Sequence, residues 1–280
     1  MKLYSQTLIV DCPDETGLIA IITNICHGQQ LNIVRNDEFV DSDHDHFFMR
    51  TELEGKFSDE SLIAELTKAL PTGANIRLVK PGRRRLVLMV TKEPHCLGEL
   101  LLKSIYGSLN AEIVAVIGNY STLADLTEKF GIPFHHITHK NIDRDIHEQQ
   151  IKGIIDGYDP DYVVLAKYMR ILTGGFVASY ANKIINIHHS FLPAFVGAKP
   201  YHQAYKRGVK IIGATAHFVT DDLDEGPIIS QDVIRVDHRY SAEKMAEAGR
   251  HVEESVLTHA LQQLLEEKVL VYKNRTVVFE

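Results

Sequence analysis

The stretch LVLMVTKEPHCLGELLLKSIYGSLNAEIVAVIGN, residues 86–119, decides the fold class. It begins with a continuous apolar run over Leu86–Thr91. A helical segment over about Pro94–Tyr106 follows and opens on a proline suited to a first helical turn. A second apolar run, Glu112–Asn119, completes the stretch. Apolar strands that alternate with helices in this way are typical of an α/β domain, in which helices cover both faces of a mostly parallel sheet.

The alternation of strands and helices continues toward the C-terminus. Expected next are a helix over 121–130, a strand over 133–137, a helix over 143–158, strands over 162–166 and 183–188 with a short helix near Ala178 between them, strands over 211–219 and 227–236, a helix over 241–267 and a hairpin over 269–279. No internal repeat or low-complexity tract interrupts this pattern. Residues 82–280 are therefore predicted to form one domain with a doubly wound sheet.

Residues 3–80 follow a different order. Strands are expected over 3–12, 32–40, 46–53 and 75–80, with one helix after the first strand and a second helix that opens at Ser58. Thr16 is a candidate cap for the first helix. The order β-α-β-β-α-β predicts a ferredoxin-like domain over residues 1–81. The run PGRRR over 81–85 is interpreted as a solvated linker between the domains, and an anion site is the alternative.

The composition excludes several classes of protein. With 30 Lys and Arg against 37 Asp and Glu, the formal net charge is −7, whereas proteins that wrap nucleic acid are usually basic. The three cysteines, Cys12, Cys26 and Cys96, form no Cys-x-x-Cys pair, which indicates a reducing compartment. No apolar run approaches the roughly 18 residues of a membrane helix, and the first residues lack a signal segment. We therefore expect a cytoplasmic protein with no nucleic-acid or membrane partner.

Common catalytic motifs are missing from the chain. No G-x-G-x-x-G, G-x-x-x-x-G-K-[ST] or G-x-S-x-G pattern occurs, and Glu93 would repel a phosphate at the helix that follows the strand over 86–91. A dinucleotide, nucleoside triphosphate or serine-elbow enzyme is therefore not expected. Cys96 lies beside His95 near a helix start, which leaves a reactive thiolate open, but a packing role is the favoured interpretation.

Metal binding has to be weighed because the chain has 15 histidines. His135, His136 and His139 form one cluster, and His44 and His46 form another. Adjacent residues of a strand point to opposite faces, so a His-His doublet cannot easily share one ion. Surface histidines are the favoured interpretation of both clusters, and no H-E-x-x-H motif is present. No metal is expected.

The segment IINIHHSFLP, residues 184–193, places polar side chains directly after an apolar strand. Asn186 and His188 are two residues apart and share a face, at the end of a strand where open α/β sheets bind ligands. By the same rule His189 should point away from His188. An Asn amide can stabilise an oxyanion and an imidazole can transfer protons, while Asp224 adds a carboxylate just before a Gly-Pro turn. The trio suits attack of water or an amine on a carbonyl, and polar loops with core histidines are the alternative.

At these residues the chain resembles the formyltetrahydrofolate-dependent formyl-transfer family. The matching stretches are Asn-Ile-His-x-Ser-x-Leu-Pro over 186–193, GATAHFV over 213–219 and LDEGPI over 223–228, and VLAKYMRIL over 164–172 is similar to the family's folate-binding loop. The resemblance implies a formyltransferase-like, Rossmann-type sheet with Asn186, His188 and Asp224 as catalytic residues. It also implies a set of substrate-binding residues: Met169, Arg170, Ile171, Leu172, His217 and Thr220.

Two differences from the transferases indicate which branch of this family the chain resembles. The loop Thr91–Cys96 lacks the glycines with which glycinamide ribonucleotide formyltransferases grip a phosphate, and the doublet His188-His189 is similar to formyltetrahydrofolate deformylases. This similarity implies hydrolysis of 10-formyltetrahydrofolate to formate and tetrahydrofolate, with folate as substrate and no cofactor. The formate would supply purine synthesis, and the reaction would balance one-carbon pools. A formyltransferase with an unidentified amine acceptor, or a folate or amino-acid sensor with weak catalysis, remains the alternative.

The N-terminal unit resembles an ACT domain, with Cys12–Leu18 as its first turn. That resemblance implies pairing into a homo-oligomer and binding of a small amino acid at Asp14, Thr16, Gly17 and Leu18. Gly17 would let the backbone approach a ligand closely, and the following helix N-terminus could receive a carboxylate. Methionine and glycine are the first effectors to consider, and a plain dimerisation module is the alternative.

Overall fold

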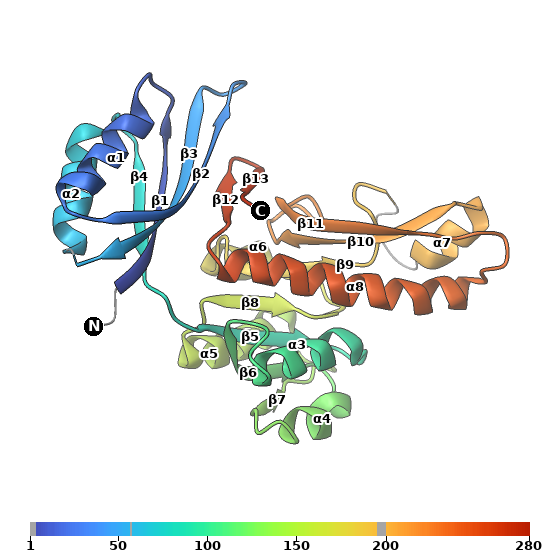
Figure 1. The fold of residues 1–280 in the computed structure, drawn as a ribbon. Helices are drawn as coiled ribbons and strands as arrows, with labels where there is room; N and C mark the ends of the chain where they lie inside the picture. Colours follow the sequence, from blue (N-terminus) through green and yellow to red (C-terminus); the bar gives the residue numbers. More distant parts are fainter. Residues whose placement is uncertain (1–3, 57, 195–199) are drawn as a thin grey trace. The chain divides into compact units, whose positions relative to one another are not determined.

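The computed structural model describes residues 4–56, 58–194 and 200–280 and divides the chain into two compact units (Figure 1). The first unit runs to Gly82 and also contains Val277–Glu280, and the second is Arg83–Thr276. The last four residues, which the sequence assigned to the second domain, thus group with the first unit.

The first unit is a four-stranded antiparallel sheet in the order β2-β3-β1-β4 with two helices on one face. Its elements are β1 (Tyr4–Pro13), α1 (Leu18–Gly28), β2 (Asn32–Asp41), β3 (His46–Gly55), α2 (Asp59–Ala69) and β4 (Asn75–Val79). Leu8 and Val10 of β1 pack against Leu18 and Ile22 of α1 and against Leu62 of α2 in one buried core. The alternation along β1 and the helical spacing in α1 and α2 explain this core, and the predicted ferredoxin-like order is confirmed.

The two helices of the first unit begin differently. Ser58 caps α2 and accepts a hydrogen bond from the backbone N–H of Ser61. The expected cap of α1 by Thr16 is wrong, because Gly17 occupies the cap position and no side chain caps this helix. Gly17 has a φ of +96°, a conformation that glycine adopts without steric cost.

The second unit is built on a seven-stranded sheet in the order β11-β10-β9-β8-β5-β6-β7. Neighbouring strands from β9 to β7 are parallel, and β10 is antiparallel to both β9 and β11, so the prediction of a mostly parallel sheet is confirmed. Its elements are β5 (Arg84–Val90), α3 (His95–Ile105), β6 (Ala111–Gly118), a 3-10 turn η1 (Ser121–Leu123), α4 (Ala124–Glu128), β7 (Phe134–His136), α5 (Arg144–Tyr158), β8 (Tyr162–Leu165), α6 (Gly174–Ser179), β9 (Ile184–His188), α7 (Pro200–Arg207), β10 (Ile211–Phe218), β11 (Ile228–Arg235) and α8 (Ala242–Leu265).

Helices cover both faces of this sheet. Leu86 and Leu88 of β5 pack toward α3 and α8, whereas Val87 and Met89 of the same strand pack toward α5 and α6. A strand that is apolar on both faces needs this two-sided cover, which accounts for its continuous apolar sequence. A short hairpin of β12 (Val269–Tyr272) and β13 (Arg275–Val278) ends the chain.

Two features of the second unit differ from expectation. Helix α7 was not predicted, because its sequence PYHQAYKR is mostly polar and its packed side consists of little more than Tyr201 and Ala204. The arginines of the expected solvated linker instead belong to the folded unit. Arg83 donates hydrogen bonds to the backbone oxygens of Ser104 and Ala111, and Arg84 begins β5 and forms an ion pair with Glu267. Within the described ranges, none of the helices combines the length and the apolar character needed to span a bilayer.

Candidate active site

A cavity of about 280 Å³ lies at the carboxyl ends of β8 and β9 in the second unit. Its volume is close to the lower bound of about 300–1,000 Å³ that is usual for small-molecule sites. The cavity brings together every catalytic and substrate-binding residue that the sequence predicted: Asn186, His188 and Asp224 with Met169, Arg170, Ile171, Leu172, His217 and Thr220. It is also lined by Asp221 and Leu223, which lie in the stretch 220–224 whose backbone the resemblance placed at the folate, and by Lys167 and His189, which were not predicted as site residues.

Three structural elements position the polar side chains of this cavity. Asn186 and His188 lie on β9 and point to the same side, as their spacing predicted. His217 lies on β10, directly opposite Asn186 in the antiparallel register. Asp224 lies in the loop between β10 and β11 with a φ of +57°, a left-handed conformation that Asp tolerates better than most residues.

The Asp224 carboxylate lies next to two of the cavity histidines, His188 and His217. Its Oδ1 is 3.3 Å from Nδ1 of His188 and 3.8 Å from Nε2 of His217. Burial alone would raise the pKa of Asp224, but the hydrogen bond from His188 and the neighbouring histidines hold this pKa below its usual value. The carboxylate therefore stays ionised and fixes the proton of His188 on Nδ1.

The other ring nitrogen of His188, Nε2, is available to bind a ligand in the cavity. Nε2 of His188 is buried and has no hydrogen-bond partner within residues 4–56, 58–194 and 200–280, although the ring lines the cavity. A buried polar nitrogen without a partner is costly, so it is suited to bind a water or a substrate atom. With Nδ1 protonated, Nε2 is the proton-accepting nitrogen.

His217 orients Asn186 rather than facing the substrate as a base. Its Nδ1 donates to the backbone oxygen of Phe218 at 2.8 Å, so its Nε2 accepts from the Asn186 amide at 3.1 Å. Burial lowers the pKa of His217, which keeps the ring neutral and supports this tautomer. One amide hydrogen of Asn186 is used in this contact, and the other remains for a ligand oxygen.

Buried contacts brace the loops on either side of the histidines. The hydroxyl of Thr215 donates to the backbone oxygen of Ser190 and accepts from the backbone N–H of Leu192, which holds the chain after β9. Gly226 allows the Asp224 loop to approach β10, since a Cβ at this position would lie 1.9 Å from the backbone oxygen of Phe218. Thr215 lies in the motif GATAHFV identified in the sequence, but Thr215 itself was not predicted to have a role.

The loop after β8 supplies the apolar side of the cavity. Met169 is 57% exposed and Ile171 is 60% exposed, although both line the cavity. The loop is fixed by a hydrogen bond from the Met169 backbone N–H to Thr91 Oγ1 and by another from Arg144 to the backbone oxygen of Ile171. Fixed, exposed apolar side chains at a cavity favour binding of a flat, partly apolar ligand.

The expectation that His189 points away from His188 is wrong. The two rings are tilted with their centroids 5.2 Å apart, and both line the cavity. The alternation of side chains stops because β9 ends at His188. Burial and the charge of Lys167 lower the pKa of His189 to about 4, so this ring is neutral near pH 7.

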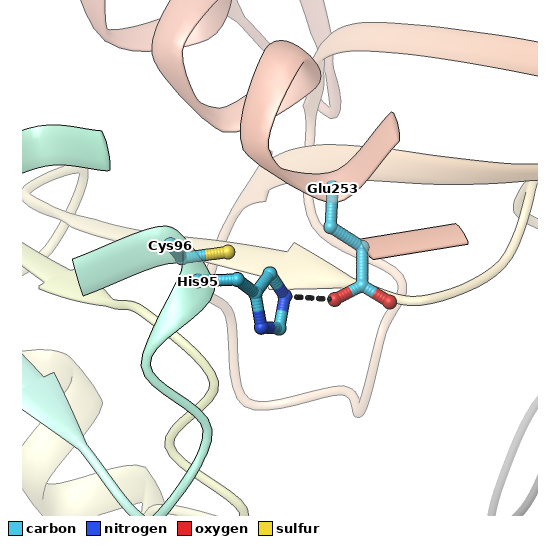
Figure 2. A group of neighbouring side chains, drawn as sticks. All are labelled: His95, Cys96 and Glu253. Carbon is cyan, nitrogen blue, oxygen red and sulfur yellow. Dashed lines mark hydrogen bonds and ion pairs between the residues drawn. The ribbon is translucent and has the colours of Figure 1, made fainter. Parts of the chain in front are cut away.

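A buried polar network lies beside the cavity, around Glu253 of α8. Figure 2 shows Glu253 with one of its partners, His95. His95 Nε2 is 2.8 Å from Glu253 Oε2, Lys167 Nζ is 3.0 Å from the same oxygen, and the Tyr201 hydroxyl donates to Oε1 at 2.8 Å. Burial acts to raise the pKa of Glu253, but these partners lower it to about 2.

His95, Cys96 and Glu253 are the one group of possible metal ligands found in the described ranges (Figure 2). This set does not fit a metal, because Glu253 is already bonded to three donors and the Lys167 ammonium would repel a cation. Cys96 is buried, and burial raises the pKa of its thiol, which agrees with a packing role rather than a reactive thiolate.

The predicted effector residues lie in the first unit at the turn between β1 and α1. Asp14, Thr16 and Gly17 are exposed, and the backbone N–H of Asp14 donates to Asp45. Leu18 is 2% exposed because its side chain packs into the core, so only its backbone could meet a ligand.

Comparisons with known proteins match both units. The formyl transferase family matches residues 84–261, and the ACT domain family matches residues 6–71. The chain is 61% identical to the formyltetrahydrofolate deformylase of Escherichia coli O6:H1 over 277 residues, which cover 99% of each chain.

Solved structures of formyltetrahydrofolate deformylases and of a related transformylase also match this chain. A crystal structure of a formyltetrahydrofolate deformylase from Pseudomonas syringae matches with a TM-score of 0.95 and 39% identity, covering 100% of this chain and 96% of the other. A glycinamide ribonucleotide transformylase from Symbiobacterium toebii matches with a TM-score of 0.69 and 26% identity, covering 75% of this chain and all of the other. The chain therefore belongs to the formyltetrahydrofolate deformylase family, with an ACT domain followed by a formyl transferase domain.

Proposed function

We propose that this protein is an enzyme that hydrolyses 10-formyltetrahydrofolate to formate and tetrahydrofolate. Full-length similarity to formyltetrahydrofolate deformylases supports the substrate and the reaction. The observation that carries the chemistry is the state of His188, whose Nδ1 is held by Asp224 while the buried Nε2 has no partner in the described part of the chain. A water molecule bound at this nitrogen would stand beside the Asn186 amide.

In the proposed reaction the trio acts on one carbonyl. Water bound to His188 Nε2 attacks the formyl carbon as the ring accepts its proton, and the Asn186 amide donates to the developing oxyanion. The bond from the formyl carbon to the folate nitrogen then breaks, and His188 returns the proton to that nitrogen. Asp224 stabilises the charged imidazolium in between, so no cofactor is required.

The folate ring is proposed to occupy the cavity beside the loop over 167–172. Its flat apolar surface would cover Met169 and Ile171, and the backbone groups over 169–172 and 220–224 would meet its polar edge. Arg170, Leu172, His217 and Thr220 complete the predicted contacts.

The test is an assay of the full chain without any amine acceptor. Mixing the purified protein with 10-formyltetrahydrofolate should release formate and tetrahydrofolate in equal amounts. Folate binding without formate release would refute the hydrolase and favour a sensor.

The oligomeric state, the effectors and the compartment of the enzyme are also proposals. We propose that the ACT domains pair two or more chains and bind methionine or glycine at the turn of Asp14, Thr16 and Gly17. The formate would supply purine synthesis. The free, buried state of Cys12, Cys26 and Cys96 supports a reducing compartment such as the cytoplasm.

A further inference from the structure

A second cavity of about 320 Å³ adjoins the first in the second unit. Its walls include Glu93, Tyr201, Arg250 and Glu253. Three residues line both cavities: Lys167, Met169 and His189. These three side chains therefore form the boundary between the cavity of the catalytic trio and the second cavity.

Lys167 is an unusual residue for this boundary. It is 5% exposed, and its φ of +64° is a left-handed conformation that is unfavourable for a residue with a Cβ. Lysine is almost never this buried unless it is paired. The fold keeps a strained, buried cation where a glycine would be easier to accommodate, and nothing in the proposed hydrolysis uses its ammonium group.

Glu253 holds the Lys167 side chain in place. The carboxylate is 1% exposed and also accepts from Tyr201 and His95, so three elements, α3, α7 and α8, converge on this pair. Moving the Lys167 side chain away would leave a buried carboxylate without its cation, which is strongly unfavourable. The Lys167 side chain is thus held in one position between the two cavities.

We infer that Lys167 determines which nucleophile reaches the formyl group, because its buried, paired side chain lies between the cavity of the catalytic trio and the second cavity. The inference rests on the proposed function and names a specificity-determining residue for the same site. Glu253 is a positioning residue that acts through Lys167.

The chemistry of the trio explains why access must be controlled. An amine could attack the formyl carbon as water does, with its proton passing through His188 to the folate nitrogen as the old C–N bond breaks. Asn186 and His188 would serve either nucleophile equally well. An amine held in the second cavity would have to pass Lys167 to reach the formyl carbon of a folate in the first cavity. A protein of this fold from Symbiobacterium toebii is named a transformylase, so the architecture can hold an acceptor.

The experiment measures how the formyl group divides between water and an amine. The full chain receives 10-formyltetrahydrofolate with excess glycinamide, and formate and formylglycinamide are quantified by mass spectrometry. The double variant Lys167→Gly with Glu253→Gln opens the passage without leaving an unpaired buried anion. We expect its ratio of formylglycinamide to formate to exceed that of the wild type at least tenfold.

Control variants distinguish the effect of the size of the Lys167 side chain from the effect of its charge. Lys167→Met with Glu253→Gln removes both charges but keeps a long side chain, and should retain the wild-type ratio. Lys103→Ala removes a lysine of α3 that pairs with Glu99 instead, and should also retain it. Lys167→Ala alone provides a second opened passage, in which Tyr201 and His95 still bind Glu253, in case the double variant does not fold.

The outcomes discriminate between the inference and the proposed function. A wild-type ratio in both opened variants would overturn the inference, as would an equal rise in the Met variant. Failure of the wild type to release formate without glycinamide would overturn the proposed function instead.

Discussion

At the scale of single residues, Asn186 and His188 take different parts of the chemistry because each has a different partner. His217 holds the Asn186 amide, and Asp224 holds the His188 ring. We predict that Asn186→Ala lowers kcat by about 10²–10³, the usual cost of losing one oxyanion donor. His188→Ala should lower kcat at least as much. Steady-state formate release measures both effects.

These losses should not reflect unfolding. The thermal unfolding midpoints of both variants should stay within a few degrees of the wild type, and His251→Ala, at a largely exposed histidine of α8, should leave kcat unchanged. Near-normal turnover in either folded variant would remove that residue from the mechanism.

His189 should make stability depend on pH. Its pKa is about 4 in the folded chain and about 6.5 when unfolded, so between these values the unfolded chain binds the extra proton. The free energy of unfolding therefore falls as the pH drops from about 6.5 toward 4, by at most about 1.4 kcal/mol per pH unit from this group. We predict that His189→Gln flattens this slope in urea titrations, whereas His251→Gln leaves it as in the wild type. An unchanged slope in His189→Gln would contradict the burial argument.

The cluster of His95, Cys96 and Glu253 should bind no metal, and the activity should need none. Glu253 accepts from Tyr201, His95 and Lys167, so its oxygens are already used. We predict that dialysis against a strong chelator leaves the rate of formate release unchanged. Loss of activity that a divalent ion restores would contradict this prediction.

At the scale of elements, the loop between β10 and β11 carries Asp224 and depends on Gly226. A Cβ there would lie 1.9 Å from the backbone oxygen of Phe218, and backbone cannot move aside cheaply. We predict that Gly226→Ala destabilises the fold by about 1–3 kcal/mol and lowers kcat, because Asp224 shifts away from His188. Chemical denaturation and formate release measure the two effects together.

Gly153 of α5 provides the control for this substitution. A Cβ at Gly153 meets nothing within 4 Å, so Gly153→Ala should stabilise the helix by about 0.5–1 kcal/mol and leave kcat unchanged. A Gly226→Ala variant as stable and active as Gly153→Ala would show that the loop adapts.

Sequence patterns predicted those elements whose apolar residues repeat regularly. The continuous run of β5 and the stripe of α3 predicted the layered sheet, whereas α7 is mostly polar and packs against α8 through Tyr201 and Ala204. The trio could be predicted because it lies in two recognisable motifs, 186–193 and 223–228. The network of Lys167, Tyr201 and Glu253 could not, since its members lie far apart in sequence and charged residues usually indicate solvent.

At the scale of the whole molecule, catalysis and sensing are assigned to different units. All residues proposed for catalysis lie in Arg83–Thr276, and the proposed effector turn lies in the first unit. An effector can alter turnover only if it binds the more active and less active states with different affinity. That difference in affinity sets the largest shift between the two states that the effector can cause, and the full chain is the object to test.

We predict that methionine or glycine changes the rate of formate release by the full chain. The carboxylate of the amino acid would be received at the N-terminus of α1, where Gly17 has a φ of +96° and a Cβ would meet nothing within 4 Å. Gly17→Asp places a competing negative charge there and should abolish the response or raise the half-maximal effector concentration at least tenfold. Gly17→Asn has nearly the same shape without the charge and should respond within a few-fold of the wild type. Because both side chains are tolerated at positive φ better than most, a difference between them reports charge rather than backbone strain. Equal responses in the two variants would place the effector elsewhere, and no response of the wild type to either amino acid would leave the ACT domain with the role of pairing chains.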